Sequence, residues 1–212
     1  MNKLVLKTIG ITLVAILICV AIIYGVFALF FPKKMAKFYD GLGNDVLAVK
    51  FMDTAYQKSG DIADLDKLCM YAVKSGDNGL IAQHLGKLFE DETFKNYCLN
   101  GNGIEYYDFM ASRFVTSFYQ VSSDKNAVID KAFSLTDNYR ELSAGYTITR
   151  VCISSNPTKE VATYLKDKLT NSLSSYDETA QQLANEDLVN INKYIEKKFN
   201  LKILSSITST AL

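Results

Sequence analysis

The sequence predicts an all-α protein in which a single N-terminal transmembrane helix is followed by an α-solenoid-like stack of antiparallel helix pairs. Three observations lead to this fold class: an uncharged apolar run near the N-terminus, turns containing glycine at nearly constant intervals, and apolar residues spaced three and four apart between those turns. A half-buried strand would instead alternate apolar and polar residues.

The apolar run extends from Ile9 to Phe31 and contains no charged residue. At a rise of about 1.5 Å per residue, a helix of this length measures about 35 Å, which exceeds the hydrocarbon thickness of about 30 Å. A cleaved signal peptide has a shorter apolar region, of about 7 to 15 residues. We therefore expect an uncleaved single-pass anchor at 9–31, after a short tail at 1–8.

The lysines that flank the anchor are nearly balanced between its two ends. Two precede it and three follow it: Lys3 and Lys7, then Lys33, Lys34 and Lys37. Lysine excess marks the cytoplasmic side, but a long domain is translocated largely regardless of its charge. This favours a soluble domain outside the cytoplasm. An odd number of cysteines beyond the anchor instead fits a reducing compartment or buried thiols, so the cytoplasmic alternative stays open.

Beyond the anchor, the turns indicate short helices in succession. Glycine is followed by an N-capping residue three times, at intervals of 17 and 16 residues: Gly43-Asn44, Gly60-Asp61 and Gly76-Asp77. Glycine ends a helix in the left-handed conformation, and Asn or Asp begins the next one. The pattern is typical of helix–turn–helix units.

The remainder of the chain is also predicted to be helical. One helix contains Ile104, Tyr107, Ala111, Phe114 and Phe118 on one face. Four more are expected at Lys125–Leu135, Tyr139–Ile153, Thr158–Leu173 and Thr179–Phe199. The segment 146–153 is rich in β-branched residues, but a lone strand among helices has nothing to pair with. We therefore expect one helical-repeat domain at 35–200 and a frayed C-terminal tail at 201–212.

A spacing of small and apolar residues recurs after 34 residues. Ala48, Met52 and Ala55 form the first set, and Ala82, Gly86 and Phe89 form the second. On this pattern and period, residues 35–94 resemble the tetratricopeptide repeat in a degenerate form. The resemblance implies that these six residues pack the repeat helices together, and that the stack binds a protein or peptide on its concave face.

The sequence indicates no catalytic, cofactor-binding or metal-binding residues. His84 is the only histidine and lacks a nucleophile motif, and Cys69, Cys98 and Cys152 lack C-x-x-C spacing. Acidic and basic residues number 23 each, so no basic excess points to nucleic acid. We interpret the histidine and the thiols as packing residues.

These observations favour a membrane-anchored module for protein–protein interaction or scaffolding, with no enzymatic activity and no cofactor. Its expected partners are a protein or peptide, and the lipid bilayer through residues 9–31. The alternative is a structural or assembly subunit of a larger membrane complex, in which the span packs against other helices. An enzyme without a recognisable motif is the third possibility.

Overall fold

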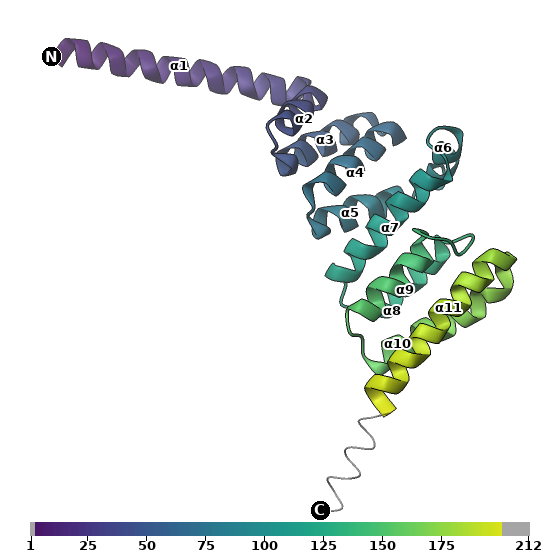
Figure 1. Ribbon diagram of the computed structural model, residues 1–212. Coiled ribbons are helices and arrows are strands. Elements are labelled where there is room, and N and C mark those ends of the chain that lie inside the picture. The colour runs from purple at the N-terminus through teal and green to yellow at the C-terminus, as the bar shows by residue number, and fades with distance from the viewer. Residues whose placement is uncertain (1–2, 201–212) are drawn as a thin grey trace, which may run out of the picture. The chain divides into compact units, whose positions relative to one another are not determined.

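The computed structural model describes residues 3–200, and every regular element in that range is a helix (Figure 1). The absence of strands from the described range confirms the all-helical class. The tail expected at 201–212 lies outside these residues. The helices group into two compact units that divide between Gly76 and Asp77, at the third of the glycine turns.

The first unit contains four helices. Their bounds are α1 Lys3–Phe30, α2 Pro32–Gly41, α3 Asp45–Ser59 and α4 Ile62–Ser75. Helix α3 packs against both α2 and α4, and α1 contacts α2. The core face of α3 consists of Ala48, Val49, Met52 and Ala55, none of which is more than 3% exposed.

The junction between α1 and α2 is a sharp change of direction at Phe31 and Pro32. Phe31 leaves the helical conformation, with φ −130° and ψ 50°, and Pro32 is the first residue of α2. Proline has no backbone N–H and disfavours the helical conformation in the residue before it. A proline therefore both ends α1 and begins α2.

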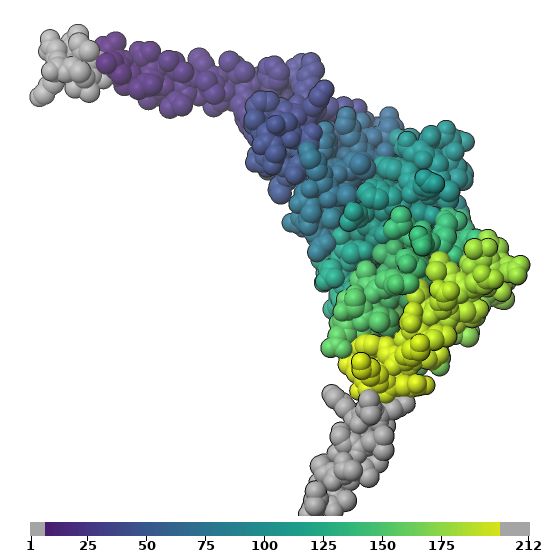
Figure 2. All heavy atoms as spheres, viewed as in Figure 1, coloured from purple at the N-terminus to yellow at the C-terminus, as the bar shows by residue number. Residues whose placement is uncertain are grey.

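Helix α1 has the properties of a transmembrane segment by length and composition. Among the described residues it is the one helix that is long and apolar enough to cross a membrane, over Lys7–Phe30. Its apolar side chains are exposed rather than buried, and Figure 2 shows α1 in purple as a rod. A helix that is apolar on all sides suits lipid better than water.

The second unit contains the remaining helices. Their bounds are α5 Asn78–Leu88, α6 Phe94–Asn100, α7 Ile104–Val121, α8 Lys125–Ser134, α9 Ala144–Ser154, α10 Lys159–Ser172 and α11 Glu178–Ile195. A 3₁₀ turn at Leu173–Ser175 precedes α11, and a π-helical turn at Glu196–Asn200 follows it. The predicted helices after residue 104 are thus present, and the β-branched segment 146–153 is helical.

Helices in the second unit contact both their nearest and their next-nearest neighbours along the chain. Helix α7 lies against α5 and α9, α9 also lies against α11, and α8 lies against α10. Consecutive helices from α7 to α11 also contact each other. The short helix α6 packs against α7, where the Phe94 ring lies 5.9 Å from that of Tyr107.

The predicted caps are confirmed at all three glycine turns. Gly43, Gly60 and Gly76 have φ values of 71°, 63° and 68°. The side chains of the residues that follow each glycine accept hydrogen bonds from the first turn of α3, α4 and α5, respectively. Local capping chemistry therefore sets the beginning of each of these helices.

The start of the helix predicted at Tyr139–Ile153 is wrong. Helix α9 begins at Ala144, because Ser143 is its N-cap and accepts a hydrogen bond from the Tyr146 amide. Leu142, just before this cap, has a φ of 66° that a helix cannot contain. Tyr139 lies instead in a loop and is only 1% exposed.

Candidate interaction groove

The six residues expected to pack the repeat helices fall into two environments. Ala48, Met52 and Ala55 are buried in the core face of α3. Ala82 and Gly86 on α5, with Phe89 at its C-cap, are half-buried. The second set therefore lies at a partly open surface of the second unit, and two of its members line a groove.

This groove, called here the α5–α8 groove, lies between α5, α7 and α8 and has a volume of about 470 Å³. It is lined by Ala82, Gln83, Gly86, Lys87, Glu90, Phe114, Phe118, Ala127 and Lys131. Ligand pockets usually measure about 300 to 1,000 Å³.

Aromatic rings form one wall of the groove. The Phe114 and Phe118 rings are stacked, with centroids 5.4 Å apart and planes at 11°. Phe89 lies 5.5 Å from Phe114 behind them. A Cβ atom on Gly86 would lie 3.7 Å from Phe114 Cε2, so a longer side chain there would project over the ring. Small residues on α5 thus leave the aromatic wall accessible.

Charged side chains border the aromatic wall. Lys87 lies in the last turn of α5, Glu90 follows that helix, and Lys131 comes from α8. None of the three has an ion pair with another residue in the described range. The border therefore carries one net positive charge that the fold leaves uncompensated.

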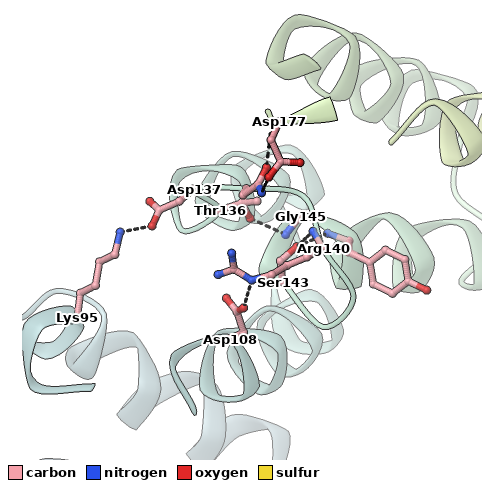
Figure 3. A network of polar contacts seen from close by, with 10 residues as sticks. Lys95, Asp108, Thr136, Asp137, Arg140, Ser143, Gly145 and Asp177 are labelled. Atoms are coloured by element: carbon pink, nitrogen blue, oxygen red, sulfur yellow. Dashed lines mark hydrogen bonds and ion pairs between the residues drawn. The ribbon is translucent and has the colours of Figure 1, made fainter. Parts of the chain in front are cut away.

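A network of polar contacts holds the loop between α8 and α9 in place (Figure 3). Arg140 Nε donates to the buried Asp108 carboxylate at 2.5 Å, which raises the pKa of Arg140. Thr136 Oγ1 accepts the Gly145 amide at 2.7 Å. A buried carboxylate is stable only when it is paired and hydrogen-bonded, so this loop supplies Asp108 with its partner.

The same loop is also tied to α6 and α11 by pairs visible in Figure 3. Lys95 forms an ion pair with Asp137, and the Asn138 amide donates to Asp177, the N-cap of α11. The carboxylate of Asp177 has a lowered pKa because it accepts the Ala180 backbone N–H. These contacts join several helices, and we interpret them as structural.

The most buried acid in the second unit is also fully partnered. Asp187 is 2% exposed and accepts a hydrogen bond from the Tyr139 hydroxyl at 2.9 Å. Its other oxygen lies 3.2 Å from Arg150 Nη2. Burial raises the pKa of Tyr139. Since both carboxylate oxygens are engaged, Asp187 is arranged for stability rather than for proton transfer.

The thiols and the histidine do not form a chemical site within the described chain. Cys69, Cys98 and Cys152 are completely buried, and Cys152 Sγ accepts the Tyr119 hydroxyl at 3.6 Å. Burial raises the pKa of the Cys152 thiol, which disfavours the reactive thiolate. His84 is 3% exposed in α5. No group of three potential metal ligands occurs among the residues that the structure describes.

Comparisons with protein-family models, with curated proteins and with solved structures give no match.

The sequence singled out some of the groove residues, but as helix-packing positions rather than as a binding site. The size pattern pointed to Ala82, Gly86 and Phe89, and the helical periodicity pointed to Phe114 and Phe118. Lys131 and Ala127 come from α8, which is separated from α5 along the chain by α6 and α7. No local signal in the sequence indicates that α8 completes the groove.

Proposed function

We propose that this protein is a membrane-anchored helical-repeat module that binds a peptide segment of a partner protein in the α5–α8 groove. It acts as a scaffold and performs no catalysis. The observation that carries the proposal is the aromatic wall of Phe114 and Phe118, left open by Ala82 and Gly86 and bordered by unpaired charges.

The exposed apolar surface of α1 supports the membrane anchor. No residue of the segment Lys7–Phe30 is buried in the fold, and the segment would present a large apolar surface to water if it were soluble. At about 1.5 Å per residue, it spans about 36 Å, enough for a bilayer core of about 30 Å. A single-pass span at 9–31 is the simplest way to cover this surface.

The pattern of helix contacts supports a repeat stack within the second unit. Contacts of α7 with α5 and α9, and of α8 with α10, are what two layers of alternating antiparallel helices require. The caps that begin α3 and α4 in the first unit and α5 in the second support the proposal, because a tetratricopeptide-like repeat consists of short helices joined by tight turns. Stacks of this kind commonly present grooves to extended or helical peptides.

The composition of the groove favours a particular class of peptide. Stacked rings provide an apolar surface for one bulky aliphatic or aromatic side chain. Lys87 and Lys131 exceed Glu90 by one charge, so an acidic residue beside the anchor would be favoured. We therefore expect a segment in which a bulky apolar residue lies next to Asp or Glu.

Site-specific photocrosslinking in native membranes tests this function. A photoreactive amino acid replaces Gln83, in the groove, or Gln120, which is exposed at the end of α7 and does not line it. We expect a discrete adduct from position 83 and none from 120. Lys131→Glu should abolish the adduct, whereas the exposed Lys193→Glu should preserve it.

The identity of the crosslinked segment provides the second part of the test. A synthetic peptide of that sequence should bind the purified protein, and Lys131→Glu should weaken it at least tenfold. Equal crosslinking from positions 83 and 120, unaffected by Lys131→Glu, would contradict groove binding. That outcome would favour the alternative, an assembly subunit surrounded by permanent neighbours.

A further inference from the structure

We propose that the junction of α1 and α2 is a binding site for an anionic phospholipid, with one acyl chain along α1 and the phosphate at Lys34 and Lys37. This inference rests on the membrane span of the proposed function and goes beyond it. It concerns the first unit alone, and it is independent of the α5–α8 groove.

The first observation is an apolar groove between the end of α1 and α2, called here the junction groove. It has a volume of about 370 Å³ and is lined by Val20, Ile23, Tyr24, Phe27, Lys34, Met35 and Phe38. Lys34 is the one charged residue in this lining. An apolar groove with a single cation at its border suits an amphiphile that has a hydrocarbon chain and an anionic group.

The second observation is a neighbouring hollow that shares Lys34. It has a volume of about 350 Å³ and is lined by Phe30, Phe31, Pro32, Lys33, Lys34, Ala55, Lys58 and Ser59. Three lysines therefore gather around the point where α1 ends. Because Lys34 lies at the border of both depressions, a headgroup bound there can be continuous with a chain in the junction groove.

The partners of the lysines show which of them are available. Lys33 forms an ion pair with the buried Asp64 at 2.7 Å, and Lys58 donates to the Leu29 carbonyl. The first contact joins α2 to α4, and the second joins α3 to α1. Lys34 and Lys37 are exposed and have no acidic partner within the described residues. Lys34 Nζ lies 5.1 Å from the centre of the Phe31 ring, but neither Lys34 nor Lys37 has a carboxylate partner, so both can pair with an anionic ligand.

Asp40, the acidic residue of α2, does not compete for Lys34 and Lys37. Asp40 forms an ion pair with Lys74, whose pKa it raises through the hydrogen bond between them. Lys34 lies one turn before Phe38 and three residues before Lys37, so these three side chains share a face of α2. That face is exposed, since Phe38 is 57% exposed.

The position of α2 puts this face beside the last turns of α1. Val20 and Phe38 line the same groove, and the Tyr39 hydroxyl donates to the Tyr24 hydroxyl at 3.1 Å, so α2 lies beside the last turns of α1. Tyr24 is of a residue type that is enriched at bilayer interfaces. Lysines at this level can reach lipid phosphates while their stems remain in the apolar layer.

The charge and the apolar lining together favour a phospholipid over a soluble phosphate. A soluble anion would be bound by the lysines alone and would leave the apolar side chains of the junction groove exposed. Clusters of lysine next to a membrane-spanning helix attract anionic lipids, and the attraction per lysine corresponds to roughly a fivefold preference. A phosphatidylglycerol-like lipid satisfies both parts of the site.

The full-length chain reconstituted in vesicles tests the proposal. The vesicles contain phosphatidylcholine with a minor fraction of phosphatidylglycerol, and spin-labelled versions of each lipid report the fraction immobilised by the protein. We expect a several-fold preference for phosphatidylglycerol in the wild type. Lys34→Gln/Lys37→Gln should remove most of it, whereas Lys50→Gln/Lys67→Gln, which removes two exposed lysines elsewhere in the first unit, should preserve it.

Two further measurements identify the source of the phosphate and the role of the groove. Ile23→Trp fills the junction groove without changing charge, and we expect it to reduce immobilisation of phosphatidylglycerol. Soluble glycerol phosphate, added at matched ionic strength, should not displace the labelled lipid. Displacement by glycerol phosphate, or an equal lipid preference in wild type and Lys34→Gln/Lys37→Gln, would overturn the proposal.

Membrane insertion is measured separately by flotation with the vesicles and by resistance to alkaline extraction. Failure of the wild type to insert would contradict the anchor itself. Stable insertion without any preference for phosphatidylglycerol would contradict only the lipid site. The two inferences are therefore distinguishable in one set of samples.

Discussion

Tyrosine side chains fill buried positions in the second unit and bring hydroxyl groups into its interior. Tyr139 is 1% exposed and donates to Asp187, and Tyr119 is 4% exposed and donates to Cys152. Tyr107 on α7 is also buried, and its ring lies against Phe94 of α6. A buried phenol is stable as the neutral species, because ionisation in an apolar interior is costly. High pH should therefore weaken the fold.

Tyr107 provides a direct test of this dependence. Burial raises its pKa to about 12, above the ordinary value of 10.0. The neutral phenol therefore contributes stability that is fully present below about pH 10 and is lost as the pH rises through about 12. Between pH 8 and pH 11, both proteins should lose unfolding free energy. We expect the loss to be about 1 kcal/mol smaller for Tyr107→Phe than for the wild type.

Urea unfolding of the detergent-solubilised chain, followed by far-ultraviolet circular dichroism, measures this difference. Each protein is compared with itself at pH 8, so that any packing effect of the substitution cancels. Parallel stability profiles for the two proteins between pH 8 and pH 11 would show that burial does not perturb this tyrosine.

Helices α3 and α5 carry small and apolar residues at the same spacing but use them differently. On α3, Ala48 is completely buried against its neighbours. On α5, the corresponding Ala82 is half-buried and lines the α5–α8 groove. A pattern in sequence therefore corresponds to close helix packing in one unit and to an open surface in the other.

Leucine substitutions distinguish these two environments. Ala48→Leu should overpack the first unit and reduce the unfolding free energy by roughly 1 to 3 kcal/mol. Ala82→Leu should change it by less than about 0.5 kcal/mol, because the new side chain can enter the groove. It should, however, block peptide binding. Thermal melts of both variants measure the difference, and equal losses of stability would show that Ala82 is also a close-packed position.

Helix boundaries at the glycine turns were predictable from local chemistry, whereas the start of α9 was missed although Ser143 caps it locally. The turns at Gly43, Gly60 and Gly76 contain both the conformation and the capping residue within two positions. The segment before α9 is different, since Tyr139 is held in its loop by Asp187, which follows it by 48 residues. A prediction from periodicity alone therefore extended the helix back to Tyr139.

The candidate sites show the same distinction. The apolar run of α1 and the lysines after it were visible in the sequence, but the junction groove exists because α2 lies beside α1. The α5–α8 groove needs three helices, and Lys131 reaches it from α8. Proximity between segments that are far apart along the chain has no signature in a single sequence.

At the scale of the whole molecule, the chain combines an apolar rod, a juxtamembrane cluster of lysines and a helical unit with a groove. A span at 9–31 would leave the lysines of α2 and the groove of the second unit on the same side of the membrane. The partner of the groove and the lipid of the junction must therefore be present on one side, and the sidedness of the domain decides which partners can reach it.

We propose that this side is outside the cytoplasm, and a single engineered thiol tests it. Ser123 is exposed between α7 and α8, whereas Cys69, Cys98 and Cys152 are completely buried, so Ser123→Cys adds an accessible reporter in the domain. In a background with Cys19→Ala, a membrane-impermeant thiol reagent should label this variant on intact cells, because long domains after an anchor are translocated largely regardless of charge. The same chain without Ser123→Cys gives the background. Labelling only after permeabilisation would place the groove and the lysine cluster in the cytoplasm, where the inner-leaflet lipids are the anionic ones available and cytosolic proteins are the candidate partners.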